Sequence, residues 1–299
     1  MNTKRLVCNF LLLLAALIWG CAFVAQTVAM DHVGPLTFQT SRAILGSAVL
    51  VPVIIVSDLI KKKKGIYKKP TRTDRKNLLV GGLLCGAVLT VAAALQQIGI
   101  NLGTSSGKSG FITAMYILLV PVLGLFLKKK VRPVVWICVG LGVIGLYLLC
   151  MKDGFSIAEG DIYTLLCAVC FSVHILVVDH FSPTTDGVKL SCLQFFTMFI
   201  LSGIAMLIFE KPSFQSILTA WLPICYAGIM SCGIAYTLQI IGQKHTEPAV
   251  ASLLMSFESV FAVLAGIVLL SESPSTQEYI GSAIMFVAII ISQLPEKKV

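Results

Sequence analysis

Long apolar runs separated by short polar connections dominate this chain from one end to the other. The runs fall near residues 8–30, 36–57, 78–100, 108–127, 131–150, 162–179, 188–209, 217–241, 249–270 and 277–294. A helix needs about 20 apolar residues to cross the hydrocarbon core of a bilayer. Inside lipid the backbone must satisfy its own hydrogen bonds, which favours helices. The pattern therefore predicts an all-α integral membrane protein with ten transmembrane helices.

The composition also indicates a lipid environment. Hydrophobic residues make up 57% of the chain and charged residues only 12%, and the mean hydropathy is +0.92. A soluble domain with about half its residues apolar would carry roughly a quarter charged residues. The net charge of +9 comes from short connections such as 61–76 and 128–132. Because no connection is long enough to fold into a basic surface, we expect the bilayer as a partner and no nucleic acid.

The basic residues are distributed unequally between the two sides of the predicted topology. The first apolar run continues to about Met30, which is too long for a cleaved signal peptide and makes it the first transmembrane helix. With a cytoplasmic N-terminus, the Lys and Arg residues fall on the cytoplasmic side except Arg42, Lys108, Lys152 and Lys211. This asymmetry satisfies the positive-inside rule. We therefore predict a multi-pass protein of the cell (plasma or inner) membrane with both termini in the cytoplasm.

The two halves of the chain resemble each other. The sequence LQQIG at residues 95–99 recurs as LQIIG at residues 238–242. This similarity divides the chain into two repeats, residues 1–150 and 151–299, of five predicted helices each. Because five is odd, the second repeat would be inverted in the membrane. Inverted repeats are typical of secondary transporters, which place their substrate site where the two halves meet.

Three stretches of sequence resemble a known family. They are LIWGCAFVA at 17–25, QTSRAILGS around Arg42, and PAVASLLMSFESVFAVLAGIVLLSESPSTQEYIGSAI at 248–284, which includes Glu272. Together they resemble the EamA family of the drug/metabolite transporter (DMT) superfamily, as two tandem repeats over almost the whole chain. Residues 107–133 depart from the usual pattern, as does Ser259, where the family often has proline.

The resemblance implies a fold and a function. The fold would be two inverted five-helix repeats around a central cavity, lined by helices one, three, four, six, eight and nine. The function would be secondary transport of small organic metabolites such as amino acids or drug-like compounds, by alternating access and mostly as export. Such a carrier would need no cofactor and no ATP. It would work as a monomer or a homodimer, with a small-molecule substrate and coupling to protons or another ion as its expected partners.

Three motifs mimic other functions but lack the context that those functions require. VGLGVIG at 139–145 contains GxGxxG, but it lies inside an apolar run and not after a strand of a soluble βαβ unit. GTSSGKS at 103–109 is one residue short of a phosphate-binding loop, so Lys108 is interpreted as a boundary residue that snorkels. Cys167 and Cys170 form a lone CxxC with no second ligand pair. We therefore expect no metal site.

Several polar and aromatic residues inside the predicted helices are candidates for substrate binding. Gln96 and Gln239 can donate and accept hydrogen bonds, which suits a polar substrate but equally suits contacts between helices. His174 could titrate or simply pack. The aromatic candidates, which could line a cavity or form part of the core, are Trp19, Tyr116, Tyr236 and Phe257.

Glu258 is the main candidate for substrate binding or ion coupling. It is a carboxylate in the middle of the apolar run 249–270, and exposure to lipid would be strongly unfavourable. We therefore expect it to face the bundle interior, either protonated or paired. It could bind an amino group, couple protons, or hold two helices together. Arg42 is interpreted as a structural residue, because the second helix is not expected to line the cavity.

Other classes of function remain as alternatives. An intramembrane enzyme would need clustered catalytic groups, but the sequence contains no HExxH, no GxSxG and no paired carboxylates within its apolar runs. A channel would form its pore by oligomer symmetry, whereas two inverted halves enclose a site within one chain. An importer of the same fold is the third alternative.

Overall fold

The computed structural model describes residues 3–67, 69–104, 106–129, 131–150, 158–270 and 275–293. Helices account for the regular structure of these residues, and no strand occurs among them. The helices of the first half are α1 (Thr3–Met30), α2 (Pro35–Lys63), α3 (Arg72–Asn101), α4 (Ser106–Ala114), α5 (Tyr116–Phe126) and α6 (Pro133–Cys150). Those of the second half are α7 (Glu159–Phe181), η1 (Ser182–Thr184), α8 (Gly187–Phe209), α9 (Phe214–Thr219), α10 (Trp221–Cys225), the π-helix η2 (Tyr226–Ala235), α11 (Tyr236–Gln243), α12 (Pro248–Met255), α13 (Glu258–Leu270) and α14 (Thr276–Gln293).

The prediction of an all-α integral membrane protein is confirmed at the level of helices and hydropathy. In the described ranges, eight helical stretches are long and apolar enough to cross a membrane. They are Lys4–Met30, Pro35–Lys63, Arg72–Asn101, Lys108–Phe126, Glu159–Thr184, Gly187–Phe209, Trp221–Gln243 and Pro248–Ala265. The remaining two predicted spans correspond to the shorter apolar helices Pro133–Leu148 and Tyr279–Ser292. The count of ten spans and the inverted repeat stay predictions.

Two of the spanning stretches are interrupted near their middle. The first consists of α4 and α5, which are separated at Met115, and the second consists of α12 and α13, which are separated at residues 256–257. As a result Tyr116 is the first residue of α5 and Glu258 is the first residue of α13. At each interruption the backbone keeps a tight hydrogen-bonded turn, with Met115 N–H donating to the carbonyl of Ile112 at 3.2 Å and Phe257 N–H donating to that of Leu254 at 3.4 Å. Each interruption is therefore a local tightening of the helix, directly before Tyr116 in one stretch and before Glu258 in the other.

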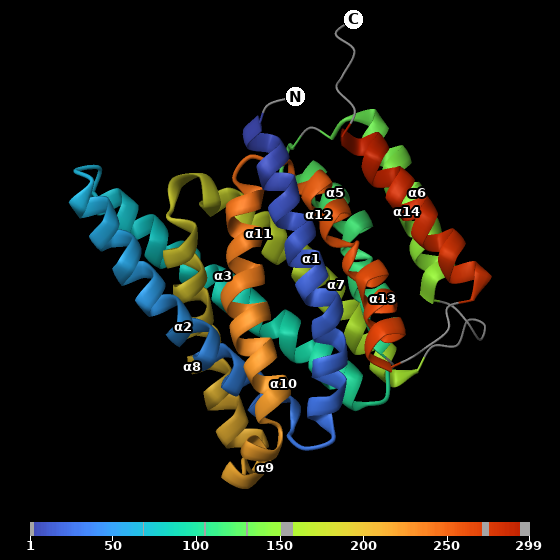
Figure 1. Ribbon diagram of the computed structural model, residues 1–299, viewed down its shortest axis with the longest axis horizontal. Coiled ribbons are helices and arrows are strands. Elements are labelled where there is room, and N and C mark those ends of the chain that lie inside the picture. The colour runs from blue at the N-terminus through green and yellow to red at the C-terminus, as the bar shows by residue number, and fades with distance from the viewer. Residues whose placement is uncertain are drawn as a thin grey trace, which may run out of the picture.

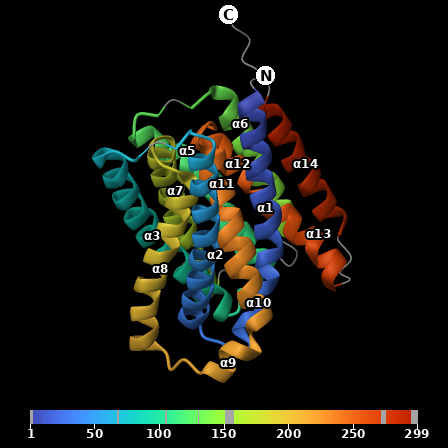
Figure 2. The ribbon, with the colours of Figure 1, turned by 60° about the vertical axis from the view of Figure 1, so that its left-hand side comes forward.

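The helices pack into a bundle with α1 near its centre and two groups beside it (Figure 1). On one side α6 and α14 pack against each other, and on the other side α2, α3 and α8 form a second group. The turned view keeps α6 and α14 apart from α2, α3 and α8 (Figure 2). Helix α1 packs against η2 and α11, which contact α2 and α8, and also against α13, which contacts α6, so it lies between the two groups.

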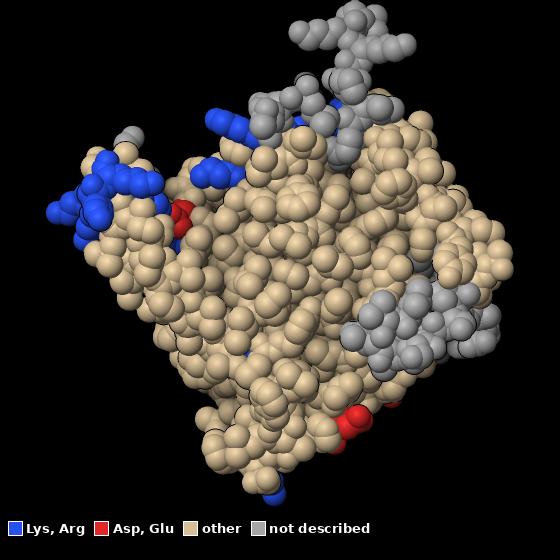
Figure 3. Space-filling view, viewed as in Figure 1, with Lys and Arg blue, Asp and Glu red and all other residues tan. Residues whose placement is uncertain are grey.

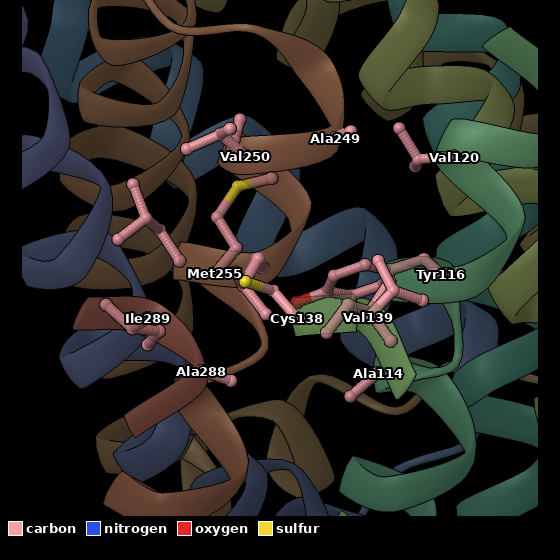
Figure 4. Packing of buried hydrophobic residues seen from close by; sticks show 14 of the residues in the cluster. Ala114, Tyr116, Val120, Cys138, Val139, Ala249, Val250, Met255, Ala288 and Ile289 are labelled. Carbon is pink, nitrogen blue, oxygen red and sulfur yellow. The ribbon is translucent and has the colours of Figure 1, made fainter. Parts of the chain in front are cut away.

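The largest apolar core lies where the interrupted helices meet α6 and α14. Figure 4 shows its buried side chains, drawn from α4, α5, α6, α12 and α14, and its members include Tyr116, Val139 and Met255. Gly20 permits a close approach of α1 to α13, because a Cβ there would lie 2.6 Å from Cβ of Phe261 and 2.8 Å from the carbonyl oxygen of Glu258. This contact fixes the position of the α13 N-terminus.

The charged side chains on the face seen in Figure 3 gather toward the ends of the bundle. The space-filling view shows Lys and Arg gathered over the end where α2 finishes and α3 begins, with a broad uncharged surface below them (Figure 3). Many large apolar side chains of the described residues are exposed, among them Val53, Ile55 and Val56 of α2. Exposed apolar surface of this extent suits contact with lipid tails.

Candidate functional site

A cavity lies inside the bundle, lined by residues from both halves of the chain. Its lining consists of Trp19, Phe23 and Gln26 from α1, Arg42 from α2, Gln96 from α3, Thr113 from α4, Tyr116 from α5, Phe171 and Ile175 from α7, Ser231 from η2, Tyr236 and Gln239 from α11, Met255 from α12 and Glu258 from α13. Polar groups in the middle of an apolar bundle are costly unless they bond to one another or to a ligand. The concentration of such groups at one place marks the cavity as the candidate site.

The structure brings six of the eight sequence candidates to this cavity. They are Trp19, Gln96, Tyr116, Tyr236, Gln239 and Glu258. His174 is fully buried beside the cavity, with its ring centroid 6.0 Å from that of Tyr236, but it is not part of the lining. Phe257 packs instead against Phe261 and Phe286, at centroid distances of 5.4 Å and 6.3 Å. Whether any of the eight binds a substrate stays a prediction.

Glu258 faces the bundle interior, as its position in an apolar run required. Its side chain is 5% exposed and accepts a hydrogen bond from Tyr116 Oη at 2.8 Å. This bond joins the first residues of α5 and α13, so the two helix breaks meet at one point. The contact fits both hypotheses from the sequence, because Glu258 lines the cavity and also links two helices.

Aromatic rings form another part of the cavity lining. Trp19 and Tyr236 meet edge to face with their ring centroids 4.8 Å apart, and Tyr236 also contacts Phe195 at 5.3 Å. Within the described chain, Trp19 Nε1 is buried and has no hydrogen-bond acceptor. Phe171 from α7 adds a further ring. These surfaces can hold the apolar part of an organic molecule, with one unused donor beside them.

The two repeated glutamines have different surroundings. Gln96 Nε2 donates to Thr113 Oγ1 at 3.0 Å, so α3 and α4 are joined beside the cavity. Gln239 Nε2 donates to Gln243 Oε1 at 3.0 Å, and Gln243 in turn donates to the carbonyl of Ile175 at 3.1 Å. Gln239 Oε1 is buried and finds no donor in the part of the chain that the structure describes. Gln239 can therefore accept a bond from a ligand.

The expectation for Arg42 is wrong in one respect. The second helix was not expected to line the cavity, yet α2 contributes Arg42 to it. Arg42 Nη1 donates to Gln26 Oε1 at 3.2 Å, and its guanidinium carbon lies 5.1 Å from the centroid of the Phe38 ring. The arginine turns inward because Gln26 on α1 offers it an oxygen and Phe38 offers it a ring face. The sequence feature that could have indicated this position is an arginine about two turns inside an apolar run.

Charged residues at the ends of the bundle form ion pairs outside the cavity. Lys108 Nζ lies 2.5 Å from Asp161 Oδ2, which also accepts the backbone N–H of Ala158. Lys108 therefore ties α4 to the start of α7. Asp179 pairs with Lys129 at the opposite end of α7.

The described residues contain no evident set of metal ligands. Among them, no three His, Cys, Asp or Glu side chains lie close enough together to hold a metal ion. Cys167 is buried and Cys170 is partly buried, and both are free thiols. Glu272, which belongs to the sequence pattern of residues 248–284, lies outside the described residues.

Comparisons with known proteins agree on one class. The model of the EamA-like transporter family matches residues 6–151 and again residues 158–294. An uncharacterized transporter of Archaeoglobus fulgidus is 29% identical over 296 residues, which is 98% of this chain and 88% of that protein. The uncharacterized transporter YoaV of Bacillus subtilis is 22% identical over 284 residues, covering 92% of this chain and 93% of its own. A crystal structure that is 20% identical superimposes with a TM-score of 0.76 over 96% of both chains, which shows a shared fold.

Proposed function

The chain belongs to the EamA-like transporter family and is a multi-pass membrane transporter, and from that premise we propose that it is a secondary carrier of small organic metabolites. Amino acids and drug-like compounds are the substrates that such a carrier would take. The observation that carries the proposal is the cavity itself, which gathers Arg42, Glu258 and several amides inside an otherwise apolar bundle. Transport would proceed by alternating access to this cavity.

The interrupted helices support a carrier with a central site. Transporters of small molecules often bind them at discontinuous helices near the bilayer midplane, where helix termini offer free backbone groups. Here Tyr116 and Glu258 each follow an interruption whose backbone stays hydrogen-bonded as a tight turn, and their side chains bond to each other across the two halves of the chain. This arrangement fits two inverted five-helix repeats that rock against each other around the site.

The proposal includes the orientation of the chain in the membrane and the direction of transport. The gathering of Lys and Arg at the end where α2 finishes supports a cytoplasmic location for that end (Figure 3). Both chain termini would then face the cytoplasm of a cell whose plasma or inner membrane holds the protein. Export is the proposed direction, and a monomer or homodimer is the proposed working unit.

Family membership favours transport over catalysis. The described residues that line the cavity include one carboxyl group, that of Glu258, and no second acid. A hydrolytic or proton-transfer enzyme would need a nucleophile or a second acid–base group at hydrogen-bond distance. Among the described residues, the group bonded to Glu258 is the phenol of Tyr116, which donates to the carboxyl group and does not place a nucleophile beside it.

Counterflow in liposomes tests the proposal. Purified protein would be reconstituted into liposomes loaded with a small-metabolite extract, and the solutes that exchange with an isotope-labelled external extract would be identified by mass spectrometry. A carrier is expected to give saturable exchange of one or a few solutes that empty liposomes lack. Chemical conversion of a solute, or an unsaturable ion current, would contradict the proposal.

A further inference from the structure

A basic hollow lies at the end of the bundle where α2 finishes and α3 begins, and it shares no lining residue with the central cavity. Its walls are the end of α2, the connection from α2 to α3, the first turns of α3 and the start of α8. Figure 3 shows Lys and Arg side chains gathered over this end. The charged residues of the lining are Lys61, Lys69, Arg75 and Lys189, with Asp58, Asp74 and Asp186. The described lining therefore holds more positive than negative charge.

The acidic residues of the hollow already have partners. Asp186 Oδ2 lies 3.0 Å from Lys61 Nζ, and Asp58 Oδ2 lies 2.7 Å from Lys189 Nζ. Asp74 caps the start of α3, where its Oδ2 accepts a backbone N–H at 2.9 Å. Each acid is therefore occupied by a bond within this chain, and the two ion pairs neutralise two of the four basic residues of the lining.

Lys69 and Arg75 are the two basic residues of the lining that remain. Both side chains are exposed, and no ion pair among the described residues involves either of them. An ammonium group and a guanidinium group that line one hollow can bind the oxygens of one phosphate group, because phosphate accepts several charge-assisted hydrogen bonds. The lining thus offers the donors that a phosphate group requires.

An apolar groove on α2 adjoins the hollow. The residues that line the groove are Pro52, Val53, Val56, Ser57, Ile60 and Lys61. Lys61 also belongs to the lining of the hollow, so the groove and the hollow meet at this residue. Val53 and Val56 are exposed, and they belong to a helix that is long and apolar enough to cross a membrane. An acyl chain that lies in the groove would therefore end beside the basic hollow.

The connection between α2 and α3 combines apolar and basic side chains in the same way. Ile66 is 63% exposed, and the ring centroid of Tyr67 lies 5.1 Å from Lys62 Nζ. Apolar and aromatic side chains enter the boundary region of a bilayer, whereas lysines reach the phosphates of its headgroups. A soluble phosphate compound would gain nothing from an exposed isoleucine or from the groove on α2. These features favour a lipid over a free anion.

We propose that the hollow binds an anionic phospholipid, with the phosphate held by Lys69 and Arg75 and one acyl chain lying in the α2 groove beside Pro52. This end of the bundle is the one proposed to face the cytoplasm, where clusters of basic residues attract anionic headgroups. Each such residue near the membrane surface contributes about fivefold to the affinity. The lipid surface lies outside the central cavity, so its occupancy does not depend on the substrate or on the direction of transport.

Basic residues that served only to orient the chain during insertion would behave differently. In that case the purified protein would attract anionic lipid through its general charge, and the loss of binding would depend on how many charges are removed and not on which ones. Two pairs of exposed basic residues from residues 63–76 separate the two roles, because only one pair lines the hollow.

Native mass spectrometry of the full-length protein in detergent tests the proposal, because it counts bound lipid molecules. The probes are palmitoyl-oleoyl phosphatidylglycerol and the phosphatidylcholine with the same acyl chains. We expect phosphatidylglycerol to bind with a Kd at least about 10-fold lower than that of phosphatidylcholine. Inorganic phosphate and glycerol 3-phosphate at millimolar concentration should not displace it, because neither has an acyl chain for the groove.

Lys69→Gln combined with Arg75→Gln should raise the Kd for phosphatidylglycerol roughly 10- to 30-fold and leave that for phosphatidylcholine unchanged. The matched control is Lys63→Gln combined with Lys76→Gln, which removes the same charge from exposed residues that do not line the hollow. The control should raise the Kd by no more than about 3-fold, because salt screens charges outside the hollow. All four side chains are exposed, so both variants should fold, and size-exclusion chromatography checks this. If the first variant is not monodisperse, its two single changes carry the comparison, each with a rise of about 5-fold.

Three outcomes would overturn the proposal. Equal Kd values for the two lipids would exclude recognition of the anionic headgroup. Equal losses in the two double variants would show general attraction to the basic segment. Displacement of the lipid by inorganic phosphate would show that the hollow takes a soluble anion. A loss of phosphatidylglycerol binding confined to the Lys69 and Arg75 variant would support the proposal.

Discussion

The protein holds charge in two contrasting ways. At the ends of the bundle, Lys61 pairs with Asp186 at 3.0 Å and Lys189 pairs with Asp58 at 2.7 Å, and all four side chains remain partly exposed. In the cavity, Glu258 and Arg42 are almost completely buried, and within the described chain their hydrogen-bond partners are neutral. Paired charges at a boundary need no further partner, whereas buried charges without one indicate a site that a ligand completes.

The exposed ion pairs and the buried charges of the cavity are expected to contribute differently to stability and to transport. Exposed ion pairs contribute about 0–1 kcal/mol each, because water screens them and because two flexible side chains must be ordered. A desolvated charge acts over a longer range and interacts more strongly with an incoming group. Changes at the ends should therefore affect folding slightly and exchange hardly at all, and changes in the cavity should do the reverse.

The largest effect is expected from Glu258→Gln. Glutamine keeps the size of the side chain and can still accept the bond from Tyr116, so insertion and folding should be retained. Loss of the carboxylate should reduce solute exchange about 100-fold, the effect expected when a charged partner of the substrate is removed. The measurement is initial exchange in liposomes between pH 5.5 and 8.5. Exchange like that of the parent at every pH would assign Glu258 to packing alone.

A smaller effect is expected from Tyr116→Phe. This change removes the hydroxyl that donates to Glu258 at 2.8 Å but leaves the ring in the apolar core. Without that bond the carboxyl group is less well positioned, and exchange should fall about 10-fold, which corresponds to about 1.4 kcal/mol. The control is Tyr226→Phe, whose hydroxyl donates to the carbonyl of Ile18 outside the cavity lining. Equal loss in both variants would show a general effect on packing.

Asp161→Asn should affect stability and leave exchange unchanged, which is the opposite of the effect expected for changes in the cavity. Asp161 lies at the end of the bundle, where it accepts bonds from Thr104, from Lys108 and from the backbone of Ala158. Loss of this cap should lower stability by about 1–2 kcal/mol, seen as a lower midpoint of thermal unfolding in detergent. The KM for exchange should not change. A changed KM with unchanged stability would contradict this account and would place the Lys108–Asp161 pair in the substrate path.

The smallest effect is expected from Lys61→Gln. Both members of the Lys61–Asp186 pair are more than a third exposed, so the loss of stability should be below about 1 kcal/mol. Burial raises the pKa of Asp186, but hydrogen bonds from Lys61 and from the backbone of Lys189 outweigh burial and lower it below the usual range. A lowered pKa stabilises the fold above about pH 4 and loses that effect as the pH falls further. Thermal unfolding of parent and variant should therefore converge in acid, and divergence there would contradict this account.

The sequence alone was sufficient to predict the class of protein and many of the residues that line the cavity. Apolar runs of spanning length required helices in lipid, and the cost of burying Glu258 required it to face inward, as it does. The interruptions at Met115 and at residues 256–257 could not be predicted, because neither position has Gly or Pro and because polar residues such as Ser256 also occur inside continuous helices. The π-helix η2 was also missed, because hydropathy along the chain does not distinguish a π-helix from an α-helix.

Arg42 shows a second limit of the sequence. Its depth in the second apolar run indicated that it was unusual, but not whether it pointed to lipid headgroups or to the bundle interior. That choice depends on Gln26 and Phe38, whose positions relative to Arg42 are known only from the packing of α1 and α2. Conversely, Phe257 was one of the aromatic residues that could line a cavity or form part of the core, and its ring contacts Phe286 of α14 and is not part of the cavity lining.

The central claim is that the buried carboxyl group of Glu258 belongs to the substrate site, and chemical labelling tests it most directly. Dicyclohexylcarbodiimide is apolar and reacts with protonated carboxyl groups in membrane interiors, and mass spectrometry of peptides then locates the adduct. We expect Glu258 to be labelled in the purified protein, and we expect a solute that exchanges in liposomes to slow this labelling at concentrations near its KM. Asp186 at the boundary should show no such protection. Labelling of Glu258 at the same rate with and without that solute would contradict the account.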